Sequence, residues 1–288
     1  MRGPAEAAKF IDAYVDFEEP PIKIITVLVR IIEGEGHAKN DDALELAERW
    51  LGRFKVHLAN RIAEETQLSQ VPCCELNPAN EDYLQGPCFV SPKLSEQEAK
   101  EKRLRANKKH YTDAFSKISN DKFETLCARV LSLWRVEEEF VSRRSADQGV
   151  DFFGRVPFGE IMKPSAIGNG AERQLKLWLV GQAKNYSSSQ VSTKDIRELV
   201  GSVSLARSKT YAGSIDPLAR LEMRTCDPVF FLFFTTGKLS KDAWDLLSKS
   251  GVVAMDGAQL AVFLADHGVG MVEGQFNPES FWGWVGDP

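Results

Sequence analysis

Apolar residues recur with a helical spacing in the first part of the chain. Residues 22–32 form an apolar run, and Asp41 and Asp42 then precede a stripe of apolar positions that extends from Leu44 to Ile62. The members of this stripe lie three or four positions apart, which is the spacing of one helix face. We therefore expect a mainly helical N-terminal region.

Two further segments of this region lack an apolar stripe. Prolines and a glycine interrupt residues 71–92, at Pro72, Pro78, Gly86, Pro87 and Pro92. This composition predicts an irregular connector. The segment from Ser95 to about Lys109 is highly charged, and we expect a helix there whose charged side chains are solvated.

From residue 120 the pattern alternates between helical stripes and short apolar strands. Asn120 or Asp121 is expected to cap the first helix. Strands are predicted at 136–142, 150–154, 175–184, 229–235 and 252–255, and further helices at about 193–208, from 240, and at 258–267. Helices that alternate with strands predict an α/β domain in which helices cover a central sheet.

The composition is that of a globular protein. Of 288 residues, 43% are hydrophobic and 27% are charged, with a formal net charge of −5. These values exclude a disordered chain and a protein that binds by bulk positive charge. No apolar run reaches the roughly 20 residues that a membrane span needs, and the five cysteines are irregularly spaced. We expect a reduced, cytoplasmic protein.

Charge changes sign along the chain. Residues 1–92 hold nine Lys or Arg against sixteen Asp or Glu, whereas residues 93–117 hold eight against four. Such a reversal is typical of a functional boundary. We predict that the chain divides into a mainly helical region at 1–117 and a second domain at 118–288.

One strand carries polar residues where apolar ones are expected. Gln182 and Lys184 lie two positions apart at the end of the strand 175–184, and therefore on one face. If the preceding strand is an antiparallel neighbour, Asp151 lies beside them, and Glu124 on the first helix faces the same region. A buried Asp–Lys pair that only stabilises the sheet explains this pattern equally well.

The carboxylate, amide and lysine side chains of this set suit metal-assisted chemistry on a phosphate. A carboxylate and an amide oxygen are ligands that Mg²⁺ accepts, because it is a hard ion that prefers oxygen. A nearby lysine can stabilise the charge that develops on a phosphate. Hydrolysis of a phosphodiester needs these parts.

The same residues resemble the pattern of a known family. Asp147 to Asp151 (DQGVD), followed by Gln182 to Lys184 (QAK), is similar to the D-x-G-x-D and Q-x-K motifs of Mrr-type restriction endonucleases in the PD-(D/E)xK nuclease superfamily. Phe123 and Glu124 resemble the family's FE pair. Two later segments also match: FTTG at 234–237 with Ser240 and Ala243, and MDG at 255–257 with Leu260, Ala261 and HGVG at 267–270. The resemblance covers about residues 118–272.

The resemblance implies a Mg²⁺-dependent DNA endonuclease, in which Mn²⁺ can substitute, with a mixed central sheet flanked by helices. It assigns Asp151, Gln182 and Glu124 as metal ligands and Lys184 as the catalytic lysine. Gln182 stands where most of the superfamily has Glu. Gly149 would give the backbone the freedom that Asp151 needs to approach.

Basic and amide side chains near these motifs suit a DNA backbone. Residues 143–209 hold eleven Lys or Arg against six Asp or Glu. The side chains expected to contact DNA phosphates are Arg143, Arg144, Asn185, Lys194 and Arg197. The residues at 193–197 also open a helix, whose N-terminus favours anions.

Three functions remain open at this point. The first is the nuclease effector of an anti-phage defence or restriction system, acting on double-stranded DNA as a homo-oligomer or with a sensor or ATPase subunit. The acidic residues 1–92 favour regulation over direct DNA reading. The alternatives are a structure-specific nuclease for repair or junctions, and an inactive DNA-binding scaffold on the same fold.

Overall fold

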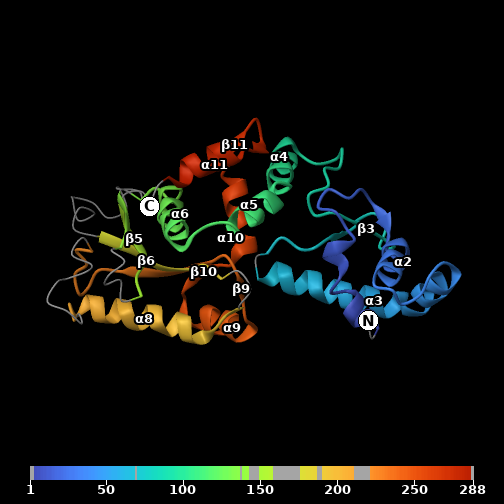
Figure 1. Ribbon diagram of the computed structural model, residues 1–288, viewed down its shortest axis with the longest axis horizontal. Helices are drawn as coiled ribbons and strands as arrows, with labels where there is room; N and C mark the ends of the chain where they lie inside the picture. The colour runs from blue at the N-terminus through green and yellow to red at the C-terminus, as the bar shows by residue number, and fades with distance from the viewer. Residues whose placement is uncertain are drawn as a thin grey trace. The chain divides into compact units, whose positions relative to one another are not determined.

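The computed structural model describes residues 3–68, 70–136, 138–142, 149–157, 176–186, 190–210 and 221–286. Figure 1 traces the chain from end to end. It divides into two compact units, Met1–Lys108 and Lys109–Pro288. In the described parts of the chain, no helix combines the length and the apolar character that crossing a membrane requires.

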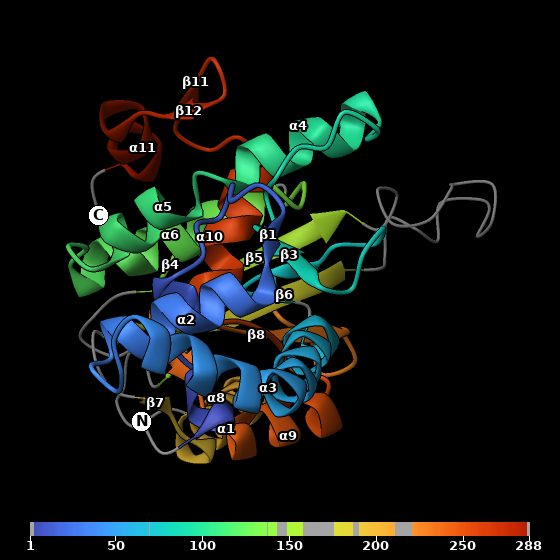
Figure 2. The same cartoon turned by 90° about the vertical axis from the view of Figure 1, so that its right-hand side faces the viewer.

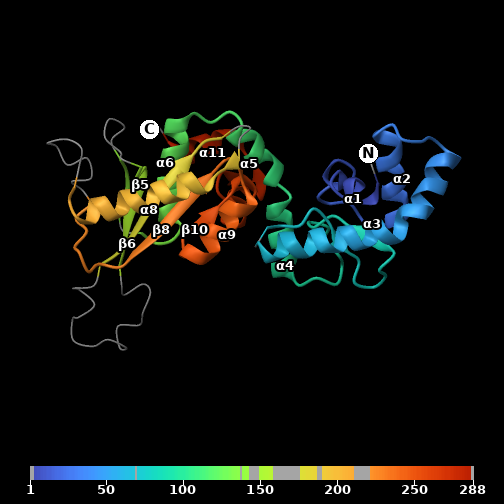
Figure 3. The same ribbon diagram turned by 90° about the horizontal axis from the view of Figure 1, so that it is seen from below.

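The first unit is mainly helical, as its apolar spacing predicts. Its elements are α1 (Pro4–Ala7), a 3-10 turn (Ile11–Ala13), β1 (Ile22–Lys23), α2 (Ile24–Gly34), α3 (Asp41–Gln67), β2 (Glu75–Leu76), β3 (Tyr83–Gln85) and α4 (Glu96–Arg105). Helices α2 and α3 pack against each other through one apolar face each (Figure 3). The predicted connector 71–92 differs from expectation, because β2 and β3 lie in it and form an antiparallel sheet in the order β1-β3-β2.

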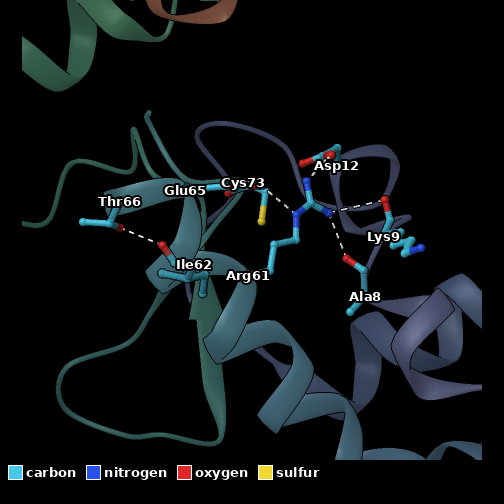
Figure 4. A network of polar contacts seen from close by, with 8 residues as sticks. All are labelled: Ala8, Lys9, Asp12, Arg61, Ile62, Glu65, Thr66 and Cys73. Carbon is cyan, nitrogen blue, oxygen red and sulfur yellow. Dashed lines mark hydrogen bonds and ion pairs between the residues drawn. The ribbon is translucent and has the colours of Figure 1, made fainter. Parts of the chain in front are cut away.

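Arg61 ties helix α3 to the start of the chain (Figure 4). Its guanidinium donates to the Ala8 carbonyl at 2.8 Å, to Asp12 at 2.5 Å and to Glu65 at 2.7 Å. The second carboxylate oxygen of Glu65 accepts the backbone N–H of Cys73 at 2.8 Å. One partly buried cation therefore joins three segments of the first unit.

The second unit is an α/β domain. Its elements are α5 (Lys108–Phe115), α6 (Asn120–Ser132), β4 (Glu138–Val141), β5 (Phe152–Pro157), β6 (Lys176–Lys184), β7 (Gln190–Val191), α8 (Thr193–Arg207), β8 (Val229–Thr235), β9 (Lys238–Leu239), α9 (Lys241–Ser250), β10 (Val253–Met255), α10 (Gly257–Asp266), β11 (Met271–Val272), β12 (Gln275–Phe276) and α11 (Pro278–Val285). The first of these helices begins at the last residue of the other unit. Ser119, one residue before the predicted cap, accepts the Lys122 N–H and so caps α6.

The central sheet is mixed and flanked by helices, which confirms the α/β part of the predicted fold class. Its order is β10-β8-β6-β5-β4, with β4, β5 and β6 antiparallel and β6, β8 and β10 parallel. Alternate residues of β6 bury on opposite faces: Leu177 and Leu179 join the core under α6 and α10, while Trp178 and Val180 join the core under α8 and α9. Figures 1 and 2 show these helix layers on either side of the strands.

The two units meet earlier in the chain than the predicted boundary at residue 117. Helix α5 belongs to the second unit, because Tyr111, Ala114 and Phe115 are buried in its core. The Tyr111 hydroxyl donates to the Val269 carbonyl at 2.5 Å. Charge reversal marked a surface property, whereas burial of apolar side chains sets the division between the units.

Candidate active site

Asp151 lies at the end of the antiparallel pair β5 and β6. Phe152 pairs with Gly181 in this ladder, and Asp151 is the next residue outward on its strand. Its backbone N–H donates to the Gly181 carbonyl at 2.9 Å, and its carboxylate accepts the backbone N–H of Ala183 at 2.7 Å. Asp151 therefore contacts the neighbouring strand on both sides of Gln182.

Gln182 and Lys184 share the face of the sheet that α8 covers. Gln182 is 1% exposed, so its amide must find partners inside the protein. One end of that amide faces the backbone carbonyl of Asp195 at 3.2 Å, and the other faces Lys184 Nζ at 3.1 Å. Since a carbonyl only accepts and an ammonium only donates, the amide nitrogen points to Asp195 and the oxygen to Lys184.

The first turn of α8 is itself held by hydrogen bonds. Asp195 accepts the backbone N–H and the hydroxyl of Ser192, both at 3.0 Å, which completes a capping box. The Tyr186 hydroxyl donates to its other oxygen at 3.0 Å. Burial raises the pKa of Asp195, but these hydrogen bonds and the charge of Lys184 outweigh it, and the pKa is lowered. Asp195 is therefore a carboxylate at neutral pH.

Glu124 stands on α6, which packs over the opposite face of the sheet from α8. One turn later, Cys127 is completely buried between α6 and the strands. Burial raises the pKa of the Cys127 thiol, and the charges of Asp151 and Glu124 raise it further. The two carboxylates thus act on the same buried thiol, while the Gln182–Lys184 pair contacts α8.

Gly149 brings the chain close to α8 just before Asp151. Its φ is +84°, a backbone conformation that side chains disfavour. A Cβ at this position would lie 2.6 Å from Ser202 Oγ and 3.5 Å from the Gln182 amide. A glycine is therefore required here by both backbone conformation and space, in line with the freedom expected from the sequence.

The residues expected to contact DNA divide into three groups. Arg143 and Arg144, like Asp147, lie outside the described residues. Lys194 and Arg197 are exposed in the first two turns of α8. Asn185 is used within the fold, where its side-chain amide is fully hydrogen-bonded.

The side chain of Asn185 connects three elements at the end of β6. Its nitrogen donates to the Ile118 carbonyl at 2.9 Å and to Asn120 Oδ1 at 3.1 Å. Its oxygen accepts the Thr236 hydroxyl at 2.8 Å. Both amide hydrogens are occupied, so the structure gives Asn185 a role in joining the start of α6 and the end of β8 to the end of β6.

The donor set suits a hard cation. Asp151 and Gln182 offer oxygen atoms at one strand end, which is the ligand type that Mg²⁺ takes together with water. Within the described ranges, no group of three or more His, Cys, Asp or Glu side chains gathers as a metal cluster. Cys73, Cys74 and Cys88 are buried and form no disulfide.

Sequence reasoning proposed Asp151, Gln182 and Lys184 for the site but did not include two residues that surround them in the structure. Tyr186 and Asp195 carry no feature of a catalytic motif. The signal available for Asp195 was its place three residues after Ser192, which is the spacing of a capping box. Its contact with Gln182 depends on how α8 crosses the sheet.

Comparisons with known proteins gave structural similarities only. No protein-family model and no curated protein matches the sequence. The structure is similar to MspJI restriction endonuclease in complex with a 27-mer oligonucleotide (21% identity, TM-score 0.35, 62% of this chain and 36% of that chain). It is also similar to restriction endonuclease FokI bound to DNA (11%, 0.36, 91% and 45%) and to a second FokI structure (11%, 0.33, 96% and 46%). The chain spans less than half the length of each of these proteins.

Proposed function

We propose that this protein is a Mg²⁺-dependent DNA endonuclease that hydrolyses phosphodiester bonds. The observation that carries the proposal is the convergence of Asp151, Gln182 and Lys184 at one end of the β5–β6 pair. A carboxylate, an amide oxygen and an ammonium group are the parts that metal-assisted phosphodiester hydrolysis needs. The resemblance of these residues to the Mrr-type motifs supports the same reaction.

Each residue has a definite part in this proposal. Asp151 and Gln182 would hold the metal, with Glu124 as a supporting carboxylate. When bound, the ion would supply Lewis acidity toward the phosphate and acidify a coordinated water. Lys184 would place its ammonium at the phosphate and stabilise the negative charge that develops there. The Ala183 N–H fixes Asp151, so the carboxylate is in position before substrate arrives.

Double-stranded DNA is the proposed substrate because the surroundings favour a polyanion. Lys194 and Arg197 are exposed on the first turns of α8, and that helix N-terminus attracts anions. Residues 143–209 are net basic in a chain whose overall charge is −5. Phosphate contacts of this kind give affinity and orientation without sequence preference.

We further propose that the nuclease is the effector subunit of an anti-phage defence or restriction system in the cytoplasm. The acidic first 92 residues are poorly suited to bind DNA directly, because non-specific affinity comes from phosphate neutralisation. A regulatory or assembly role suits them better. A homo-oligomer, or a complex with a sensor or ATPase subunit, would then supply a second active site and target recognition.

The test compares cleavage of plasmid and linear DNA by the wild-type protein, Asp151→Ala and Lys184→Ala, with Mg²⁺ or Mn²⁺. The proposal expects cleavage by the wild type alone. Equal cleavage by all three proteins would refute the assigned site. A wild type that binds DNA and cuts none, with either metal and with candidate partners present, would instead favour the inactive scaffold. Preference for branched DNA would favour a repair or junction nuclease.

A further inference from the structure

The Gln182 amide contacts a hydrogen-bond acceptor at one end and a hydrogen-bond donor at the other. Its nitrogen donates to the Asp195 carbonyl at 3.2 Å, and its oxygen accepts from Lys184 Nζ at 3.1 Å. With 1% of its surface exposed, water does not compete for either contact. The side chain therefore has one satisfied orientation.

A glutamate in the same place would lose one of these contacts. It matches glutamine in length, but an ionised carboxylate has no hydrogen to donate. One of its oxygens would face the Asp195 carbonyl oxygen across about the same gap, and two acceptors in a buried site are costly. The contact with the neighbouring helix therefore favours an amide over a carboxylate at position 182.

The Asp195 carbonyl stands in the first turn of α8, and the side chain of the same residue caps that turn. Ser192 and Tyr186 together donate three hydrogen bonds to the Asp195 carboxylate, all at 3.0 Å. These contacts hold the first turn of α8 and with it the carbonyl that receives the Gln182 amide. The chain of contacts runs from the helix cap through the amide to Lys184.

We propose that Asp195 is a positioning residue of the active site, which orients Gln182 so that its amide oxygen faces Lys184 and the proposed metal. The inference rests on the proposed nuclease function. An amide oxygen has two lone pairs, so one can accept from Lys184 while the other remains for a cation. Asp195 does not itself touch the substrate or the metal in this proposal.

The first experiment measures the Gln182 amide in the full-length, metal-free protein, and so does not depend on activity. Side-chain amide hydrogen exchange is followed by ¹H–¹⁵N NMR, with the Gln182 signal assigned by its loss in Gln182→Glu. We expect these hydrogens to exchange more slowly than those of the exposed Gln67. Exchange as fast as that of Gln67 would overturn the proposal.

The second experiment tests the role of Asp195 through metal binding and cleavage. Asp195→Ala removes the acceptor for Ser192 and Tyr186, whereas Asp195→Glu keeps a carboxylate at the third position of the capping box. Gln259→Ala is the matched control, because Gln259 completes the capping box of α10 in the same unit. The measurements are Mn²⁺ binding by electron paramagnetic resonance, the Mn²⁺ concentration for half-maximal cleavage, and the thermal midpoint.

We expect Asp195→Ala to raise the half-saturating Mn²⁺ concentration by about 10- to 100-fold, the range found when residues that orient metal ligands are removed. Asp195→Glu should restore tight binding, and Gln259→Ala should leave it unchanged although both alanine variants lower the thermal midpoint. If Asp195→Ala and Gln259→Ala change Mn²⁺ binding equally, Asp195 is merely structural and the proposal fails.

Gln182→Glu separates this inference from a purely metal-based explanation of the site. If residue 182 only coordinates the ion, a carboxylate should bind Mn²⁺ more tightly and cut faster. The positioning role predicts the opposite, weaker binding and slower cleavage with a lower thermal midpoint. A wild type that cuts no DNA with either metal, even with candidate partners present, would refute the nuclease proposal, whereas slow amide exchange in that same protein would still support the Gln182–Asp195 contact.

Discussion

The Asp151 carboxylate accepts the backbone N–H of Ala183 at 2.7 Å. The acidic side chain just before β5 is therefore hydrogen-bonded to the neighbouring strand β6, at the residue between Gln182 and Lys184. Asp151 is 5% exposed. A hydrogen bond to the backbone fixes a carboxylate more firmly than contact with a flexible side chain would. The residues proposed to act on a phosphodiester are thus held by the sheet itself.

Replacing Asp151 separates its charge from its structural bond. Asp151→Asn keeps an oxygen that accepts the Ala183 N–H, so we expect unfolding free energy within about 1 kcal/mol of wild type. Cleavage should fall by at least about 100-fold, because the metal loses its charged ligand. Asp151→Ala should lose cleavage and also about 1–3 kcal/mol of stability, since a buried N–H is left unpaired. Urea unfolding and plasmid cleavage measure the two effects; equal stability of both variants would contradict the bond's role.

Lys184 should contribute to DNA cleavage, whereas Lys176 at the other end of β6 should not. Lys184→Met removes the ammonium beside Gln182, and we expect cleavage to fall about 100-fold or more, as when a single charge-stabilising donor is removed. Lys176→Met changes the same residue type on the same face of the strand, near Glu222. Initial cleavage rates at saturating Mg²⁺ give the comparison. Equal losses in the two variants would remove Lys184 from the mechanism.

Two glycines near α8 should respond to alanine in opposite directions. Gly149→Ala places a Cβ 2.6 Å from Ser202 Oγ at a φ of +84°, and should cost roughly 1–2 kcal/mol. Gly201 lies inside α8 with open space around its Cβ position, so Gly201→Ala should stabilise by up to about 1 kcal/mol. Thermal midpoints of the two variants and the wild type, measured by circular dichroism, test both expectations. A neutral Gly149→Ala would show that the segment before Asp151 relaxes freely.

Acid should weaken the second unit through Asp227. Burial raises the pKa of this carboxyl, but hydrogen bonds from Arg224 and Trp178 outweigh it and lower the pKa below its usual 3.8. Because the pKa of Asp227 is lower in the folded protein than in the unfolded chain, its ionised carboxylate stabilises the fold when the pH is above the pKa of the unfolded chain. This stabilisation is lost as the pH falls through the pKa of the folded protein. Asp227→Asn should therefore be less stable than wild type at pH 6, with the difference shrinking below about pH 4. Urea unfolding followed by tryptophan fluorescence tests this. The exposed Asp113→Asn should show no such trend.

The division between the two units is testable with fragments. A fragment of residues 109–288 retains Tyr111, Ala114 and Phe115, which are buried in the core of the second unit. A fragment of residues 118–288 removes them and exposes the apolar surface that they cover. We expect the first to unfold cooperatively and the second to be less stable or aggregated, judged by thermal melting and size-exclusion chromatography. If both fragments melt with the same stability and neither aggregates, the division between the units lies near residue 117 instead.

Periodicity in the sequence predicted most of the second unit. The run at 229–235 forms β8 with the predicted bounds, because a strand buried on both faces is continuously apolar. Ser240 caps α9 as expected. The small sheet of the first unit was missed, since strands of two or three residues are too short to show any alternation.

The sequence by itself determined which residue types stand at positions 151, 182 and 184 of the candidate site, and that two of them share a strand face. Only the tertiary structure decided what holds them. The crossing of α8 over the sheet brings the Asp195 carbonyl to Gln182, and the end of β6 brings Asn185 to Ile118 and Thr236. Local spacing encodes the face of a strand, whereas contacts between distant segments depend on how the helices pack on the sheet.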